Sequence, residues 1–459
     1  MERIRYLLVP VIIPLIPLLG LFFTPQTQRR RRFITGGLLF TIVFAFLGMG
    51  LQGSVKPASV GWLEFSLQST PLGGVFSLSM AVLLCLTGIF GFEVLDGKER
   101  NYYIAFLTVC IAVQAVACMG SLPLFLAAWL AGAIACDALV KRNPKGLRFY
   151  RIGTAISGAL LVVGTALAIS QRTALTFLPH TVKTDIALPA ALLVAGFALH
   201  TLVCQLTPAA APTSVVLYVG MGSVGLFGVI QTIYYLFGIS ALEGTFLQSW
   251  LPPVFLLIAF AAGLLALRSQ NLTQRLGCLA ASQSGIILFG LCALQKELFI
   301  GAALLLVLGD ICMTALLLCS SAFRYTQGKT LVSQLEGIGR QMPLALFCFG
   351  CAAFGLVGLP PFAGSVSRWH LACGALSGLD WGIFAVLALL LLAALTALSL
   401  LKPLNQGFFP GREYETDTKL HYGACVGVPI AILAAVLLFM GLFPIHLLQL
   451  VQTAACLFG

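Results

Sequence analysis

The sequence predicts an all-α, polytopic membrane protein, and three observations support this prediction. The 459 residues are 59% hydrophobic and only 9% charged, and their mean hydropathy is +1.02. Soluble domains and disordered chains are much more polar. Apolar windows long enough to cross a hydrocarbon core of ~30 Å recur along the whole chain. The polar stretches between them are too short to bury a core, so we expect one transmembrane domain over residues 1–459.

Fourteen apolar windows define the expected spans, and polar or charged residues separate them. The first window is not a typical cleaved signal peptide, because Gln28 and four arginines follow it instead of a small-residue cleavage site. The windows lie at about 6–24, 33–52, 75–93, 102–120, 122–140, 152–170, 186–204, 212–238, 251–268, 276–294, 298–320, 342–376, 381–401 and 423–444.

Prolines are expected to break two of these spans. Proline lacks the backbone donor and clashes with the preceding helical turn. Pro208 and Pro212 predict a break around span 7, and the adjacent Pro360 and Pro361 predict one inside span 12. In lipid, a broken helix persists only where protein or a water-filled cavity satisfies the freed backbone groups. Such breaks are typical of ion paths.

The spacing of the breaks and the loop charges predict a repeat and an orientation. Two breaks five helices apart indicate two inverted five-helix units, spans 4–8 (about 102–238) and spans 9–13 (about 251–401). With the N-terminus outside, nineteen of the 26 lysines and arginines fall in inner loops and six in outer loops. The positive-inside rule therefore favours a multi-pass protein of the inner (cytoplasmic) membrane, with both termini on the outer, periplasmic side.

The net charge of +11 follows from this topology. Basic inner loops that face anionic lipid are sufficient to explain it. We therefore expect the lipid bilayer as a partner and no nucleic acid.

Four ionisable side chains lie inside the spans and are the candidates for an ion path: Asp137, His200, Asp310 and Arg368. Each costs roughly 2.5–3.5 kcal/mol at mid-helix, so each is expected to face inward and to have a partner. His200 and Asp310 are the candidates for proton exchange, although an interhelical hydrogen bond stays open as the role of His200. Asp137 has Lys141 four residues on, so a surface ion pair is its alternative. Arg368 keeps its proton and is expected to set the local field.

Neutral polar residues near these charges are expected to support a hydrated half-channel. Singly, such residues are helix-packing groups in membranes. The supporting set is Ser214, Ser223, Ser282, Gln283, Ser284, Thr314 and Ser367.

The cysteines give no sign of a metal or cofactor site. Nearly all of the fourteen fall inside spans, where a free cysteine behaves as a small hydrophobe. The pair Cys348 and Cys351 has redox-motif spacing, but no histidine or further cysteine lies near it in the sequence. Glycine-rich phosphate loops, haem motifs and iron–sulfur spacings are absent from the sequence, so no metal and no cofactor are expected.

Several stretches resemble the antiporter-like subunits of the respiratory complex I superfamily, which includes membrane-bound hydrogenases and Mrp sodium–proton antiporters. The stretches are Ala-Leu-Arg-Ser-Gln-Asn-Leu-Thr-Gln-Arg-Leu-Gly-Cys-Leu-Ala-Ala-Ser-Gln-Ser-Gly (266–285), Gly-Leu-Pro-Pro-Phe-Ala-Gly (358–364), Ala-Pro-Thr (211–213) and Met-Gly-Leu-Phe-Pro (440–444). The resemblance implies fourteen spans with inverted repeats and both ends outside. It also implies ion translocation and assembly with other membrane and peripheral subunits.

This sequence departs from the family at the charged residues in the centre of the membrane, where some are missing and others are replaced. The family has a glutamate directly after the tryptophan of span 5, whereas Leu130 follows Trp129 here and Asp137 comes seven residues later. His200 corresponds to the family's lysine of span 7, and no ionisable residue corresponds to the one in span 8. Asp310 corresponds to a histidine of span 11, and Arg368 to the lysine of span 12.

The preferred hypothesis is a proton-translocating subunit of a complex I-like or hydrogenase-like oxidoreductase. In it His200 and Asp310 exchange the proton, Asp137 tunes His200, and Arg368 modulates the field near the outlet. The chain is not expected to be catalytic alone, since no nucleophile, base and oxyanion donors can be assembled. A non-conducting structural paralogue is the first alternative. The ion-coupling subunit of an inorganic-carbon uptake system, or of an Mrp-type cation/proton antiporter, is the second.

Overall fold

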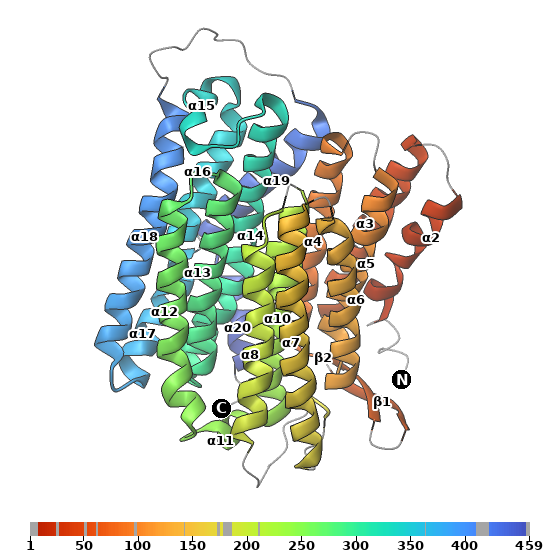
Figure 1. The fold of residues 1–459 in the computed structure, drawn as a ribbon, viewed down its shortest axis with the longest axis vertical. Coiled ribbons are helices and arrows are strands. Elements are labelled where there is room, and N and C mark those ends of the chain that lie inside the picture. The colour runs from red at the N-terminus through yellow and green to blue at the C-terminus, as the bar shows by residue number, and fades with distance from the viewer. Residues whose placement is uncertain are drawn as a thin grey trace.

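Helices that run close to one common axis make up most of the chain in the computed structural model (Figure 1). The structure describes residues 8–23, 27–49, 53–60, 63–95, 99–141, 143–171, 175–177, 186–209, 212–362, 364–409 and 422–455. The class of fold, an all-α polytopic membrane protein, is therefore as predicted.

The first half of the chain contains two short antiparallel strands as well as helices. Its elements are α2 (Leu15–Phe23), α3 (Thr27–Met49), β1 (Gly53–Val60), β2 (Leu63–Ser69), α4 (Pro71–Val94), α5 (Glu99–Cys118), α6 (Leu122–Val140), α7 (Pro144–Ser170), α8 (Ala187–Leu206), α9 (Thr213–Val215), η1 (Val216–Met221), α10 (Gly222–Ile230), η2 (Gln231–Phe237) and α11 (Ile239–Leu242).

The second half is helical throughout its described residues. Its elements are α12 (Phe246–Arg268), α13 (Leu272–Cys292), α14 (Lys296–Gln327), η3 (Val332–Gln334), α15 (Ile338–Gln341), α16 (Pro343–Val357), α17 (Gly364–Gly378), α18 (Gly382–Phe408), α19 (Ala424–Leu442) and α20 (Ile445–Ala455).

Twelve helical segments of the described chain are long and apolar enough to cross a membrane. The expected first and twelfth spans correspond to the shorter apolar helices Leu8–Leu21 and Pro343–Val357. Each of the fourteen predicted windows thus overlaps a helix, while fourteen crossings and the inverted repeat stay predictions. The strands β1 and β2 and the terminal helix α20 were not predicted.

The helix α14 forms the centre of the bundle. It has 32 residues, and the whole of its apolar window is buried by other helices. Peripheral helices such as α7 and α18 have less than half of their apolar windows buried by protein. Exposed leucine and isoleucine side chains on these outer helices are compatible with lipid contact, because lipid tails are as apolar as they are. Side chains in the apolar window of α14 are therefore surrounded by protein and not by lipid.

The break expected in span 7 lies elsewhere. The helix α8 runs unbroken from Ala187 to Leu206, and Pro208 and Pro212 lie in the connection to α9. The side-chain amide of Asn143, at the start of α7, donates a hydrogen bond to the carbonyl of Pro208 at 3.0 Å. This bond places the connection level with the end of a neighbouring helix. The prolines therefore lie in a turn between two spans. The prediction of a break in span 7 is wrong, because the helix of that span is continuous.

Span 12 is interrupted within its length. The helix α16 ends at Val357, Gly358 adopts a left-handed conformation with φ of +86°, and α17 begins at Gly364. Pro360 and Pro361 lie between the two half-helices. A residue with a side chain is strained at this φ, so glycine suits the point where α16 stops.

Span 8 contains two π-helical segments, η1 and η2, on either side of α10. Single π-turns inside α-helices often occur at functional sites. The run of glycines in this span allows α10 to pack closely on α8, where the Thr201 hydroxyl donates to the Gly222 carbonyl at 2.9 Å. No signal in the sequence marked these π-turns.

Replacing Gly225 with alanine is expected to lower the free energy of unfolding by about 1–3 kcal/mol, as overpacking does. Its new Cβ would lie 2.3 Å from Thr201 Oγ1 and 2.7 Å from the Phe197 carbonyl oxygen. Gly220→Ala is the matched control in the same span, since its nearest neighbour lies 3.6 Å away. Thermal unfolding of the detergent-purified variants measures the difference. Equal melting temperatures for the two variants would contradict the close packing of α8 on α10.

Candidate functional site

Asp310 lies in the middle of α14 and is the buried carboxylate at the centre of the bundle. Its side chain is 9% exposed, and the hydroxyl of Ser223 on α10 donates a hydrogen bond to Oδ2 at 2.7 Å. Ser223 is the second residue of α10, which follows the π-helical segment η1. The structure thus joins two of the predicted site residues that are 87 positions apart in the chain.

Arg368 extends from α17 to the break in span 12. Its Nη2 donates to the Leu356 carbonyl at 2.8 Å and to Gln283 Oε1 at 3.1 Å. The Leu356 carbonyl belongs to the last turn of α16, where carbonyls lack helical partners. The guanidinium therefore satisfies the end of one half-helix from the other, and it connects both to α13.

Polar side chains link α8, α13 and α18 near these charges. Gln205, at the end of α8, donates to Ser284 on α13 at 2.7 Å. On the other side of α13, Gln283 Nε2 donates to Thr396 on α18 at 3.3 Å. All four side chains are buried. Gln205 and Thr396 were not predicted, because a single amide or hydroxyl in an apolar window resembles ordinary helix packing.

His200 is completely buried on α8. Its ring lies edge-on against Trp129 with a centroid distance of 5.0 Å, and Nε2 lies 3.5 Å from the sulfur of Cys204. Nδ1 has no hydrogen-bond partner among the described residues. The next residue, Thr201, bonds to Gly222, which precedes Ser223. His200 and Asp310 are therefore connected through the contact of α8 with α10, and their two side chains make no hydrogen bond to each other.

Several other buried polar atoms of the described chain also have no protein partner. They are Gln205 Oε1, Ser214 Oγ, Ser282 Oγ and Arg368 Nε. Buried polar groups in proteins are almost always hydrogen-bonded, to protein or to ordered water. These atoms therefore mark positions at which bound water would complete the polar network.

Asp137 lies apart from this network. Its carboxylate accepts two hydrogen bonds from Arg151 on α7, at 2.6 and 2.8 Å. The side chains of Arg151 and Asp137 are 57% and 28% exposed, on the outer face of α6 and α7. The surface ion pair that we considered for Asp137 thus forms with Arg151 instead of Lys141. This geometry gives no support to a role for Asp137 in tuning the buried His200.

Two of the supporting residues bond to their own helices. The Thr314 hydroxyl donates to the Asp310 carbonyl at 2.8 Å, and the Ser367 hydroxyl donates to the Gly364 carbonyl at 2.9 Å. Hydroxyls that bond back to the backbone are common in membrane helices. Both side chains are fully buried, so they pack beside the path without linking its charges.

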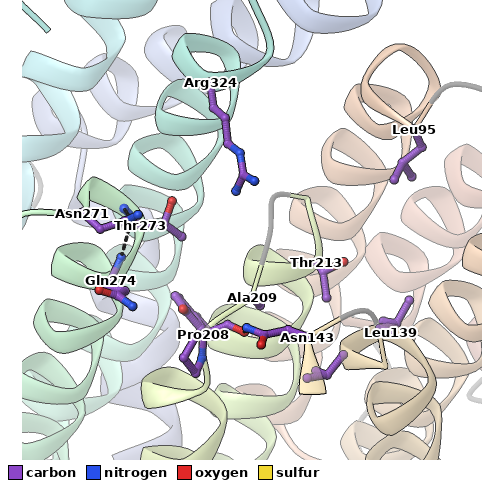
Figure 2. Close-up of a pocket in the computed structure, with 12 residues that line it drawn as sticks. Leu95, Leu139, Asn143, Pro208, Ala209, Thr213, Asn271, Thr273, Gln274 and Arg324 are labelled. Carbon is purple, nitrogen blue, oxygen red and sulfur yellow. Dashed lines mark hydrogen bonds between the residues drawn. The ribbon is translucent and has the colours of Figure 1, made fainter. Parts of the chain in front are cut away.

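A cavity of about 460 Å³ opens at the end of the bundle, between the start of α13, the start of α7 and the end of α14. Figure 2 shows Arg324 reaching into this space from α14, with Asn271 and Gln274 on one side and Asn143 below. Tyr218, on η1, also lines the cavity and lies five residues before Ser223. The cavity therefore opens beside the span that holds Ser223, and beside the end of α14, the helix that holds Asp310.

Arg275 is a buried cation, although it is one of the nineteen lysines and arginines assigned to the inner loops. Its side chain is 1% exposed and donates to the carbonyls of Ser269, Leu267 and Ser399, at distances of 2.8–3.3 Å. These contacts fix the turn between α12 and α13 against α18. A basic residue in the first turn of a span gave no signal that distinguished it from a loop arginine.

The described residues contain no group of three or more His, Cys, Asp or Glu side chains that could hold a metal ion. The candidate ionisable groups His200, Asp310 and Arg368 are instead spread singly over α8, α14 and α17. Such an arrangement suits stepwise transfer of a small ion.

The fold and these side chains define the class as a polytopic membrane protein with single buried or partly buried ionisable side chains on α8, α14 and α17. A family model described as NADH:quinone oxidoreductase/Mrp antiporter, TM, matches residues 148–396, more than half of the chain. The chain belongs to this family.

Two relatives differ in how much of their length aligns with this chain. NADH-quinone oxidoreductase subunit N of Desulforudis audaxviator is 30% identical over 201 residues, which cover 40% of this chain and 40% of the relative. F(420)H(2) dehydrogenase subunit N of Methanosarcina mazei is 24% identical over 506 aligned residues, which cover 99% of both. The chain thus matches less than half of the first relative's length and nearly all of the second.

A solved structure shows the same fold. One chain of the membrane-bound sulfane sulfur reductase, an archaeal respiratory membrane complex, superposes with a TM-score of 0.87 at 19% identity. The match covers 99% of this chain and 97% of that one. At this identity the likeness concerns the fold alone.

Proposed function

We propose that this chain is the proton-translocating membrane subunit of a multi-subunit oxidoreductase. The single observation that carries the proposal is the buried hydrogen bond between Asp310 and Ser223 in the centre of the bundle. A carboxylate in a membrane span is costly and is retained mainly where it serves an ion path. The cavity lined by Tyr218 opens at one end of the bundle, five residues along span 8 from Ser223, and is the proposed entry for water.

The proposed path crosses the bundle from α8 to α17. His200 and Asp310 exchange the proton, and water at the unpaired polar atoms bridges the gap between them. Arg368 cannot readily release its proton, so it acts through its field and through its hold on the break in span 12. Asp137 is given no part in transfer, because both of its oxygens are bound to Arg151.

The proposed partner subunits and membrane location follow from the family. Its named relatives are subunits of NADH-quinone oxidoreductase and of F(420)H(2) dehydrogenase. Other membrane and peripheral subunits are therefore the proposed partners, and they hold the redox chemistry. We place the chain in the cytoplasmic membrane, with the basic α15 end of the bundle inside and the β1–β2 end outside.

A non-conducting structural subunit is the second candidate, and one observation favours it. Trp129 packs on His200, but the residue after it is Leu130, and the nearest carboxylate on α6 is bound to Arg151. This leaves His200 without a carboxylate partner among the described residues. In that case the polar side chains would only hold the helices together.

Purification of the tagged chain in mild detergent tests the proposed assembly. Mass spectrometry of the chains that co-purify is expected to find iron–sulfur and quinone-reductase- or hydrogenase-like subunits. Those partners name the electron donor, which then drives acidification of reconstituted vesicles, followed with a pH-sensitive dye. A chain that purifies alone, or with one unrelated soluble chain, would replace the oxidoreductase with a free-standing or carbon-uptake transporter.

His200→Gln is expected to reduce donor-driven acidification strongly while leaving the complex assembled. Glutamine retains hydrogen-bonding groups beside Trp129 and Cys204 but does not titrate near neutral pH. Cys204→Ala, which removes only the thiol contact, is the matched control and should pump normally. Full pumping by His200→Gln would assign His200 to helix packing.

A further inference from the structure

A groove of about 460 Å³ lies between α2 and α3, outside the path of charges. Its walls are almost entirely apolar and include Ile16 and Pro17 from α2 and Phe33 and Phe40 from α3. Arg32 is the charged residue of its lining. The groove faces the outer side of the bundle, since more than half of the apolar window of α3 is left uncovered by protein.

Two glycines of α3 form the floor of the groove. Pro17 packs on Gly37, where an added Cβ would lie 2.6 Å from the proline ring. At Gly36, by contrast, an added Cβ would meet nothing within 4 Å. The groove therefore stays open at Gly36, and a narrow apolar group can approach the backbone there.

A cation lies at one end of the groove. Arg32 is exposed and has no ion-pair or hydrogen-bond partner in the described part of the chain. Arg29, one turn earlier, is also exposed. Both lie in the first two turns of α3, where the helix dipole favours an anion.

The length of the groove matches one leaflet of a bilayer. Arg32 and Phe44 both line it, and their separation of twelve positions corresponds to ~18 Å of helix. Half of a hydrocarbon core of ~30 Å is ~15 Å. The cation therefore lies at the level of the headgroups when the apolar part lies in the hydrocarbon.

We propose that this groove binds one anionic glycerophospholipid, with its phosphate at Arg32 and an acyl chain against Gly36. The volume favours an acyl chain over a helix of a partner subunit. A helix is ~10 Å across with its side chains, so ~18 Å of it would fill over ~1000 Å³. The proposal does not depend on ion translocation.

Native mass spectrometry of the whole complex, purified through this chain and delipidated with detergent, tests the proposal. The complex is titrated with phosphatidylglycerol and with phosphatidylcholine of the same acyl chains. The expected result is a one-to-one adduct that forms at lower concentration with phosphatidylglycerol. Arg32→Gln should remove this preference, and Gly36→Leu, which fills the open floor, should remove the adduct with both lipids.

Gly48→Leu is the matched control, because Gly48 lies on the same helix, outside the groove, and also has open space around its Cβ position. It should bind phosphatidylglycerol as the unchanged protein does. Equal binding of the two lipids by the unchanged protein would overturn the proposal, as would equal behaviour of Gly36→Leu and Gly48→Leu. Cross-linking of Gly36→Cys to another subunit in the native membrane would assign the groove to a subunit interface instead.

Discussion

Replacing Asp310 with asparagine is expected to abolish donor-driven acidification of vesicles while the complex still assembles. The amide oxygen of asparagine can accept the hydrogen bond that Ser223 gives to Oδ2, so the contact between α10 and α14 is retained. What is lost is the ability to take up and release a proton, because an amide does not titrate. Electron transfer from donor to acceptor, measured separately, reports whether the complex is intact.

Two further variants test whether the loss is specific to a titratable group at position 310. Asp380→Asn makes the same chemical change at an exposed residue between α17 and α18 and is expected to leave acidification unchanged. Asp310→Glu keeps a carboxylate and is expected to retain part of the activity. Normal acidification by Asp310→Asn would remove the observation on which the proposed function rests, and would favour the structural candidate.

Replacing Arg275 with alanine is expected to cause the largest loss of stability among the single substitutions considered, about 3–5 kcal/mol. The change leaves three carbonyls short of a donor: that of Ser399, which is buried, and those of Leu267 and Ser269, which are partly buried. Each unsatisfied buried group costs about 1–3 kcal/mol, and the missing side chain leaves a cavity as well. Thermal unfolding in detergent, followed by size-exclusion chromatography, measures the loss.

Arg268→Ala is the matched control, because Arg268 is an exposed arginine of the same α12–α13 turn. Its melting temperature should stay close to that of the unchanged protein. A similarly small effect of Arg275→Ala would mean that the bonds from α13 to α18 contribute little to the bundle. Arg275→Lys is expected to fall between the two, since lysine carries a cation without the planar fork of donors.

The bundle was predictable from sequence because its determinants are local. A run of about twenty apolar residues specifies a span wherever the span packs, and adjacent prolines interrupt a helix wherever it lies. The same rule failed at Pro208 and Pro212, since a proline at the end of a span and one inside it look alike in sequence. The structure distinguishes the two cases, because α8 ends at Leu206, before both prolines, and Asn143 bonds to the Pro208 carbonyl.

The contacts of the candidate site were predictable only in part. Asp310 and Arg368 could be named because any charge in a span is rare and costly. Their partners, Ser223 and Gln283, lie at least 85 residues away, and periodicity carries no information on such distant pairs. For the same reason, Asp137 was considered with the nearby Lys141, while Arg151 holds it from the next helix.

The central position of α14 has a consequence for biosynthesis. In the finished bundle this helix touches protein on every side, so its final surroundings do not require a lipid-like sequence. A nascent span must nevertheless leave the translocon for lipid before its neighbours surround it. Ten Leu, Ile and Val residues between positions 300 and 318 contribute about −3 to −6 kcal/mol on the insertion scale, against roughly +2.5 to +3.5 for Asp310. The leucines of α14 thus allow the cell to place a carboxylate in mid-membrane before Ser223 is there to bind it.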